Sequence, residues 1–427
     1  MIALADIYLW GLHAGTVSWD ESRQMASFEY TPEFSNAGLE LSPLMMPTRP
    51  HRVFTFTGLN PETFIGLPGL LADALPDAFG KALLDRWLAS QGRTFANPVE
   101  RLCYQGKRSM GALEFVPARD NYLERGTQLE IDSLVQVARE VLDMKKELHT
   151  NVKEDAKEAV VNIIRVGTSA GGQRAKAVIA YNDETGEVRS GQIEAPEGFS
   201  HWLLKLDGVT NAELGDPQHY GRIEYVYYLM ALEAGINMTQ CRLLEENDRA
   251  HFMTRRFDRI NSNEKVHMQT LCGIAHYDYK MMHGYSYEQA FQVMRRLHLP
   301  YNQAEQMYRR MVFNVVARNQ DDHTKNISFL MDRLGQWSLS PAYDVSWAYN
   351  PVGAWTSMHQ MSINGKWDAI TRDDLIAVAK NVNIKRPARI IEQVVDAVSH
   401  WPRLAKEHNI PADVTSAIGK THLLYNH

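Results

Sequence analysis

Residues 319–326 hold the densest group of chemically useful side chains in the sequence, Asn-Gln-Asp-Asp-His-Thr-Lys-Asn. The carboxylate of Asp321 can accept a proton, while His323 and Lys325 can donate hydrogen bonds to an anion. The side-chain carbonyl of Asn326 can bind a hard cation. Helical spacing of apolar residues precedes this stretch and a strand-like segment follows it, so it is predicted to be a loop that gathers these side chains around one point.

A second acidic residue, Asp344, follows 23 positions after Asp321. Strand-like segments at 326–331 and 336–339 flank a turn, Asp332-Arg-Leu-Gly335, and together predict a hairpin. Such a hairpin would return Asp344 to the neighbourhood of Asn326. In protein kinases, an Asn and an Asp placed in this way hold magnesium, and a loop Asp takes the hydroxyl proton. The alternative is that these residues only cap a helix and complete a turn.

A glycine-rich segment, Val166-Gly-Thr-Ser-Ala-Gly-Gly172, precedes a strand that begins at Lys176. Glycines such as Gly171 and Gly172 let backbone N–H groups approach a phosphate closely, and together with Lys176 they are predicted to bind the nucleotide. The pattern is neither GxGxxG nor Walker A, so taken alone it is weak evidence.

Lys205 lies in the middle of an apolar strand-like segment, Trp202-Leu-Leu-Lys-Leu206. A buried ammonium group needs a partner, which in kinases is the nucleotide phosphate and a Glu on the following helix. Glu224 begins such a helix. An edge-strand lysine facing water is the alternative.

The segment Arg255-Arg-Phe-Asp-Arg259 follows another predicted strand. We expect it to connect two lobes, with Arg255 and Phe257 beside the adenine of a bound nucleotide. The alternative is a solvated arginine-rich face. Histidines and tyrosines between 267 and 287 lack metal-ligand spacing and are predicted to pack in the interior.

Composition places the chain among soluble, cytoplasmic proteins. Its 427 residues are 44% hydrophobic and 22% charged, with a net charge of −6, so no strong basic field is available to hold nucleic acid. No signal peptide or membrane-spanning run is recognisable. Cys103, Cys241 and Cys272 lack metal or disulfide spacing and are expected to be buried, reduced thiols.

The elements predict an α+β chain of three domains. An N-terminal α+β domain occupies 1–118 and includes a helical segment over 67–88 with a helix start at Pro76. A polar linker follows. A mixed α/β lobe with the glycine-rich loop occupies 130–253, and a mainly helical lobe with the catalytic loop occupies 254–427.

The sequence resembles the HipA family of bacterial type II toxin–antitoxin kinases over nearly its whole length. The matching blocks are 67–81, 110–115, 256–259, 267–271, 319–326 and 341–344. The Asp-Asp-His-x-Lys-Asn block with the later Tyr-Asp is the most specific. Arg255, in a place associated with an acidic residue, and Ala175, in the loop, depart from the family pattern.

The resemblance implies a two-lobed protein-kinase-like fold and an ATP- and Mg²⁺-dependent serine/threonine kinase. Asp321 would be the catalytic base, Asn326 and Asp344 would hold magnesium, and His323 and Lys325 would support the loop and the γ-phosphate. Lys205 would bind the α- and β-phosphates. Ser169 matches a serine on which family members phosphorylate themselves.

The resemblance also implies partners. These are a HipB-type helix-turn-helix antitoxin, through which DNA is reached only indirectly, and a protein substrate of the aminoacyl-tRNA synthetase class.

Two other functions compete with the kinase. A metal-dependent phosphoesterase or nuclease could use Asp321, Asp322, His323 and Asp344 as a two-metal site, but it leaves Lys205 and the glycine loop without a role. A co-repressor with a decayed kinase site, bound to a DNA-binding antitoxin, is the non-enzymatic alternative. The presence of every expected catalytic residue type weakens it.

Overall fold

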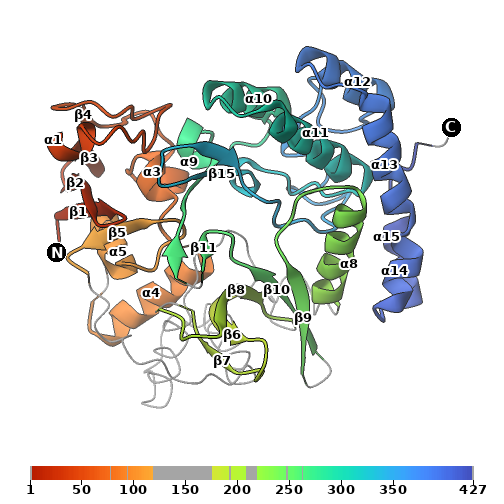
Figure 1. Ribbon diagram of the computed structural model, residues 1–427, viewed down its shortest axis with the longest axis horizontal. Helices are drawn as coiled ribbons and strands as arrows, with labels where there is room; N and C mark the ends of the chain where they lie inside the picture. Colours follow the sequence, from red (N-terminus) through yellow and green to blue (C-terminus); the bar gives the residue numbers. More distant parts are fainter. Residues whose placement is uncertain are drawn as a thin grey trace. The chain divides into compact units, whose positions relative to one another are not determined.

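The structure is a computed structural model that describes residues 2–76, 78–93, 95–118, 176–191, 194–207, 219–246, 249–261 and 263–425. The chain divides into two compact units. The first comprises 1–218, 244–268 and 332–335, and the second comprises 219–243, 269–331 and 336–427. Both sheets and helices are present (Figure 1), which confirms the predicted α+β class.

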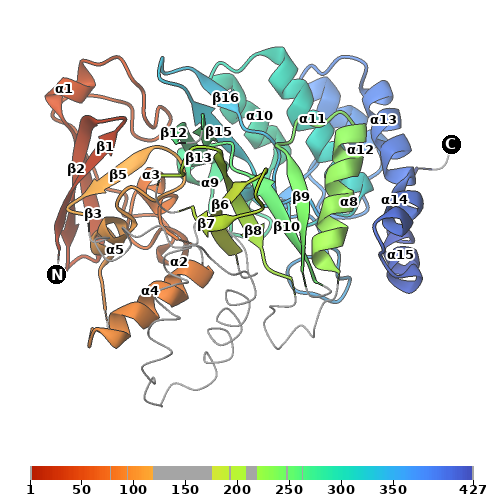
Figure 2. The same cartoon turned by 60° about the horizontal axis from the view of Figure 1, so that its bottom comes forward.

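The first unit begins with a five-stranded antiparallel sheet in the order β4-β3-β2-β1-β5. Its strands are β1 (Leu4–Leu9), β2 (Leu12–Asp20), β3 (Met25–Tyr30), β4 (Val53–Phe54) and β5 (Leu113–Val116). Alternate residues of β1 and β3 are buried, as expected for strands with one face on a core. Helices α1 (Pro32–Ser35), α2 (Pro61–Phe64), α3 (Gly69–Ala72), α4 (Ala78–Ser90) and α5 (Pro98–Gln105) accompany this sheet (Figure 2).

The continuous helix predicted over 67–88 is wrong. The chain forms α3 and α4 instead, separated by a segment that contains Pro76. Proline has no N–H to donate and disfavours helical backbone in the residue before it, so the helix is interrupted there. The prediction of a helix start near Pro76 agrees with the start of α4 at Ala78.

A second five-stranded sheet has the order β7-β6-β8-β10-β9. Its strands are β6 (Lys176–Asn182), β7 (Val188–Ser190), β8 (Phe199–Lys205), β9 (Cys241–Glu246) and β10 (Arg249–Arg255). Consecutive residues of β6 and β8 are buried over most of the length of both strands, so both faces of these strands are shielded from solvent. Gly186, with φ of +71°, completes the turn between β6 and β7.

Helices dominate the second unit. They are α8 (Tyr220–Glu233), α9 (Leu271–Ala275), α10 (Tyr287–Arg296), α11 (Tyr301–Val316), α12 (Arg372–Asn381), α13 (Pro387–Ser399), α14 (Trp401–Glu407) and α15 (Ala412–Gly419). The C-terminal half of α11 is almost wholly buried, and the helix packs against α13. Thr371 and Asp374 form a capping box at the start of α12.

The remaining strands are short. β15 (Ser328–Met331) and β16 (Trp337–Leu339) form the predicted antiparallel hairpin, and β13 (His267–Thr270) adds to β15. β11 (Arg259–Ile260) pairs with β12 (Glu264–Lys265), and β14 (Tyr285–Ser286) pairs in parallel with β17 (Met361–Ser362).

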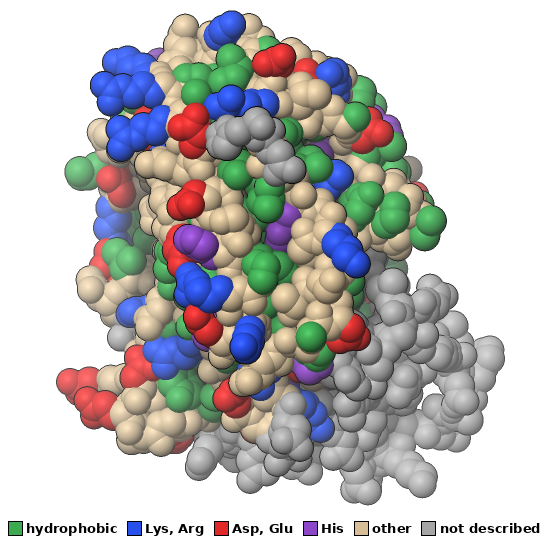
Figure 3. Space-filling model, turned by 90° about the vertical axis from the view of Figure 1, so that its right-hand side faces the viewer, with side chains coloured by type: hydrophobic (Ala, Val, Ile, Leu, Met, Phe, Trp, Pro, Cys, Tyr) green, Lys and Arg blue, Asp and Glu red, His purple; other side chains and the backbone are tan. Residues whose placement is uncertain are grey.

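The surface carries charges of both signs. On the face in Figure 3, lysine and arginine side chains lie among acidic and hydrophobic ones. Among the ion pairs of exposed side chains, Glu233 joins both His400 and Arg403. Among the described helices, none is both long and apolar enough to cross a membrane. All three cysteines are buried free thiols, as predicted.

Candidate active site

The loop of residues 317–326 starts where the buried helix α11 ends. Arg318 adopts left-handed backbone geometry with φ of +58°, which turns the chain out of the helix. A short 3-10 turn, Thr324–Asn326, closes the loop, and the Nδ1 of His323 accepts from the backbone N–H of Lys325 at 3.3 Å. The loop is therefore anchored at both ends by regular structure, as the sequence predicted.

Tyr343 ties this loop to the segment that carries Asp344. Its hydroxyl donates to the carbonyl of Lys325 at 2.6 Å and also contacts the hydroxyl of Ser328. Asp344 follows with left-handed backbone, φ of +50°. For a non-glycine residue this geometry is uncommon and is found where the surrounding structure holds the chain.

Asn326 and Asp344 line the same cavity, together with His323. The structure thus brings the two predicted magnesium ligands together. The cavity is about 30 Å³, which is room for a water molecule or an ion and far too small for a nucleotide.

The side chain of Asn326 is oriented by its own loop. Its Nδ2 donates to the backbone carbonyl of Asp321 at 2.7 Å, so Oδ1 is the atom suited to bind a cation. The described residues contain no group of three or more His, Cys, Asp or Glu arranged to hold a metal. One amide and one carboxylate suit Mg²⁺, which keeps several waters and completes its shell with substrate phosphates.

Asp321 is the most accessible acid of the loop, with 42% of its side chain exposed. Its Oδ1 accepts from the indole Nε1 of Trp355 at 2.6 Å and lies 3.7 Å from Nε2 of His323. Burial lowers the pKa of His323, although the negative charges of Asp321 and Asp344 oppose this. Because its side chain is partly exposed, Asp321 can be reached by the hydroxyl of an incoming substrate, as a proton acceptor must be.

Asp322 is buried and lines the same cavity as Asn326 and Asp344. Its Oδ2 accepts from the hydroxyl of Tyr287 and from Nδ1 of His359, each at 2.8 Å, and its Oδ1 accepts from the backbone N–H of Gln360 at 2.8 Å. Three such bonds leave the carboxylate poorly suited to bind a metal. This weighs against the phosphoesterase or nuclease alternative, which needs Asp322 as a ligand.

Sequence reasoning missed Trp355, His359 and Gln360 altogether and assigned Tyr287 only to packing. These residues lie more than 30 positions away from the loop that they contact, and no spacing pattern links them to it. The only available signal was the cluster of aromatic and polar residues shortly after Asp344. Lys325, which was also predicted to lie in this loop, has its Nζ 4.9 Å from the ring centroid of Tyr279.

In the first unit, Lys176 and Lys205 are directly opposite each other on β6 and β8. Both are buried, with 4% and 8% of the residue exposed, and Nζ of Lys205 lies 5.6 Å from the ring centroid of Phe252. Opposite residues of an antiparallel pair share a face, and like charges there repel. The solvated-edge alternative for Lys205 is wrong, because the strand is central and the side chain is buried.

Arg255 is exposed at the end of β10, opposite Trp202 of β8, and Phe257 follows half-buried. Whether they contact adenine stays a prediction. The solvated-face alternative fails for Arg256 and Asp258, which are buried.

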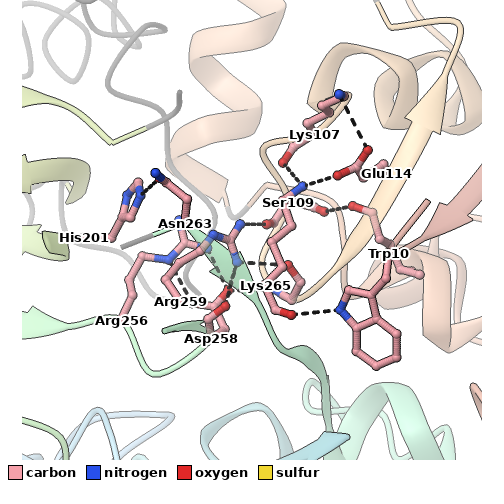
Figure 4. Close-up of polar contacts among 12 residues, drawn as sticks. Trp10, Lys107, Ser109, Glu114, His201, Arg256, Asp258, Arg259, Asn263 and Lys265 are labelled. Atoms are coloured by element: carbon pink, nitrogen blue, oxygen red, sulfur yellow. Dashed lines mark hydrogen bonds and ion pairs between the residues drawn. The ribbon is translucent and has the colours of Figure 1, made fainter. Parts of the chain in front are cut away.

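Figure 4 shows how Asp258 is held. It accepts from Nη2 of Arg256 at 2.7 Å, from Nη1 of Arg259 at 2.9 Å and from the backbone N–H of Gly111 at 2.7 Å. Burial opposes its ionisation, but the two guanidinium groups outweigh burial and hold the pKa of Asp258 well below its usual range.

The hydrogen bonds around Asp258 continue to residues 109–114, which include the start of strand β5. Arg259 donates to the carbonyls of Ser109 and Gly111, and Lys265 bonds Glu114 at 2.7 Å. Gly111 has φ of +76°, and a Cβ there would come within 2.9 Å of the Met268 nitrogen, so only glycine fits. The segment that was predicted as a connection between lobes therefore also fastens residues 107–114.

Three predicted residues, Ser169, Gly171 and Gly172, lie outside the described residues, as does the predicted linker. Glu224 lies buried on α8. Its pairing with Lys205 stays a prediction, as do the domain boundaries.

Comparison with known proteins identifies the family. A model of the HipA N-terminal domain matches residues 5–116, and a model of the HipA-like C-terminal domain matches residues 168–401, which is more than half of the chain. No curated protein shows significant sequence similarity to the chain.

The fold is similar to that of HipA in a complex of the Shewanella oneidensis MR-1 toxin–antitoxin proteins HipA and HipB with operator DNA. That match has a TM-score of 0.66 and 19% identity, and covers 97% of this chain and 94% of the other. The Helicobacter pylori proinflammatory kinase CtkA matches distantly, with a TM-score of 0.34, 11% identity and coverage of 53% and 88%. The two family models, which together span most of the sequence, establish that this chain belongs to the HipA family.

Proposed function

We propose that this chain is an ATP- and Mg²⁺-dependent protein serine/threonine kinase that acts as the toxin of a toxin–antitoxin system. The observation that carries the proposal is the geometry of one loop. Asn326 and Asp344 line one cavity, and the half-exposed carboxylate of Asp321 lies on the same loop as Asn326. Two cation ligands beside a proton acceptor are what phosphoryl transfer to a hydroxyl requires.

Each residue has a specific role in this proposal. Asp321 accepts the proton of the substrate hydroxyl, and Asn326 and Asp344 hold Mg²⁺, which neutralises charge on the phosphates when bound. Lys325 and His323 support the loop and the γ-phosphate. Lys176 and Lys205, with the glycine-rich loop at Gly171 and Gly172, bind the phosphates, and Arg255 and Phe257 lie at the adenine.

Transfer of label from γ-³²P-ATP to protein, with and without Mg²⁺, tests the activity. We expect Mg²⁺-dependent labelling of a protein hydroxyl by the wild type and none by Asp321→Ala. Hydrolysis of phosphodiesters without any labelling of protein would favour the phosphoesterase alternative. ATP binding without either activity would favour the decayed co-repressor.

The proposed partners follow from the family. The structural neighbour from Shewanella oneidensis is in a complex with HipB and operator DNA, which supports a HipB-type helix-turn-helix antitoxin as the partner and DNA contact through it. A protein substrate of the aminoacyl-tRNA synthetase class in the cytoplasm rests on the family resemblance alone. Co-purification with the product of a neighbouring helix-turn-helix gene tests the first, and phosphoproteomics after induced expression tests the second.

Self-modification at Ser169 is part of the proposal. A phosphate adds about −1.5 to −2 charges at neutral pH, which would oppose binding of a triphosphate by the same loop. Mass spectrometry after incubation with ATP and Mg²⁺ tests it. If a substrate becomes phosphorylated while Ser169 stays unmodified, regulation through this serine is excluded.

A further inference from the structure

The segment that follows Asp344 folds back along the catalytic loop. Backbone N–H of Gln320 donates to the carbonyl of Ala348 at 3.0 Å, and that of Ala348 donates to Arg318 at 3.1 Å. Farther along, Asn350 closes a turn by donating to the carbonyl of Thr356 at 3.1 Å. Residues 348–360 are thus fastened beside residues 318–322 at several points.

The end of this segment is fixed through Asp322. Gln360 donates its backbone N–H to Oδ1 of Asp322, and its side-chain amide donates to the carbonyl of Trp355. His359 binds the other oxygen of Asp322. Consequently the backbone carbonyl of Trp355 is bound by Gln360, which Asp322 in turn holds in place.

From this fixed backbone, the indole of Trp355 reaches Asp321. Its Nε1 lies 2.6 Å from Oδ1, a short distance for a nitrogen donor and one typical of hydrogen bonds to a charged acceptor. His323, the other nearby donor, is 3.7 Å from the same oxygen, which is too far for a hydrogen bond. Among the described side chains near Asp321, Trp355 therefore supplies the hydrogen bond that fixes the rotation of the carboxylate.

We propose that Trp355 is a positioning residue for the base of the proposed kinase: it holds Oδ1 of Asp321 and leaves Oδ2 to take the substrate proton. This inference rests on the proposed function. In the reaction the hydroxyl oxygen forms a bond to the γ-phosphorus, the bond from that phosphorus to the β–γ bridging oxygen breaks, and ADP leaves with those electrons. The hydroxyl proton passes to Oδ2 of Asp321 and then to solvent.

Trp355→Phe removes the indole N–H and keeps an aromatic ring. We expect kcat to fall roughly ten- to a hundredfold, because a misplaced catalytic group costs about this much. The KM for ATP should stay unchanged, since Trp355 acts only on the base. The matched control is Trp347→Phe, because the indole of Trp347 donates to Thr421 at 3.1 Å instead. That variant should retain wild-type kcat.

A rise in kcat of Trp355→Phe would overturn the proposal, because the indole would then be occupying the place of the substrate hydroxyl. Equal kcat in Trp355→Phe and Trp347→Phe would also overturn it. If the wild type itself transfers no phosphoryl group, the kinase assignment fails and the positioning role fails with it. If the wild type is active and the two variants have the same kcat, only the positioning role of Trp355 is excluded and the kinase assignment stands.

A second measurement does not depend on activity. In ¹⁵N spectra of the full chain, Trp355→Phe and Trp347→Phe assign the two indole N–H resonances. Asp321→Asn should shift the Trp355 resonance and leave that of Trp347 in place. An unmoved Trp355 resonance would show that no such bond to Asp321 forms in solution and would overturn the proposal even if Trp355→Phe were too unstable for kinetics.

Discussion

Lys176 and Lys205 face each other across β6 and β8, and both side chains are buried. Two like charges in direct opposition weaken a pair of strands unless an anion lies between or beside them. The phosphates of the proposed ligand would add negative charge close to both ammonium groups. Ligands that bind only the folded state raise its stability by mass action.

We predict that Lys205→Met abolishes most of the increase in Tm that ATP produces. The substitution keeps an unbranched apolar side chain but removes the ammonium group that is proposed to bind the phosphates. Thermal unfolding with and without ATP measures this increase. Lys81→Met, at an exposed position of α4, is the control and should keep the full ATP-dependent increase. An undiminished increase in Lys205→Met would exclude this lysine from the nucleotide site.

We predict that Asp321→Ala lowers phosphoryl transfer by about 10²- to 10⁴-fold, the usual contribution of a general base. ATP affinity should stay within a factor of about two to three, because the base acts on the hydroxyl and not on the nucleotide. Transfer rates and calorimetry of ATP binding provide the two readouts. Asp368→Ala removes an exposed aspartate and should behave as wild type. Wild-type turnover in Asp321→Ala would refute the assignment.

Asn326→Ala and Asp344→Ala should each weaken Mg²⁺-dependent ATP binding, and the double variant should lose less than the sum of the two. Both residues line one cavity and would serve one ion, so their effects cannot be independent. ATP titrations at several Mg²⁺ concentrations measure this. Unchanged affinity at saturating Mg²⁺ in both single variants would mean that the cavity holds no nucleotide-linked metal.

His201 predicts a loss of stability in acid. Burial, aided by the charge of Arg256, lowers its pKa to about 4, whereas the unfolded chain has the ordinary value of about 6.5. Between pH 4 and pH 6.5 the unfolded state binds more protons than the folded state. The contribution of neutral His201 to the free energy of unfolding is therefore complete above pH ~6.5 and is lost as the pH falls toward 4. The loss is at most about 3 kcal/mol, since one pKa unit corresponds to about 1.4 kcal/mol.

Urea unfolding of His201→Gln at pH 7 and pH 5 tests this contribution. Wild type contains other buried histidines, so the difference between the two proteins is the quantity of interest. The variant should lose less stability over this interval than the wild type. His298→Gln removes an exposed histidine and should follow the wild type. An equal loss of unfolding free energy between pH 7 and pH 5 in His201→Gln and wild type would contradict the prediction.

Asp258→Asn should lower the free energy of unfolding by about 3 to 5 kcal/mol, because it leaves Arg256 and Arg259 buried without a negative charge. Glu264→Gln is the control. Glu264 pairs with Arg333 at 3.2 Å, but both side chains are more than one-third exposed, so the change should cost less than about 1 kcal/mol. Equal stabilities of the two variants would mean that the Asp258 network contributes little.

Local patterns were enough to predict much of this molecule. The hairpin after Asn326 and the strand of Lys205 have strong alternation or turn signals, and both are present. The approach of Asp344 to Asn326 followed directly from the hairpin. The helix over 67–88 failed because its apolar periodicity continued across Pro76, where the backbone cannot.

Contacts between distant segments were not predictable. The bonds of Asp322 to Tyr287 and His359, and of Asp321 to Trp355, join positions 34 to 37 residues apart, and no local signal encodes them. Adjacent carboxylates looked equivalent in the sequence, yet one is buried and saturated while the other is half exposed. Which of them does chemistry is decided by tertiary packing.

The bond between Gly111 and Asp258 also sets an order of events during synthesis. The two residues are 147 positions apart, so the loop at Gly111 leaves the ribosome long before its carboxylate partner exists. At about 5 to 20 residues per second the wait is roughly 7 to 30 s. During that time the backbone groups at 109 and 111 lack these partners. The N-terminal sheet can form early, but its attachment through Asp258 has to wait until residue 258 has been synthesised.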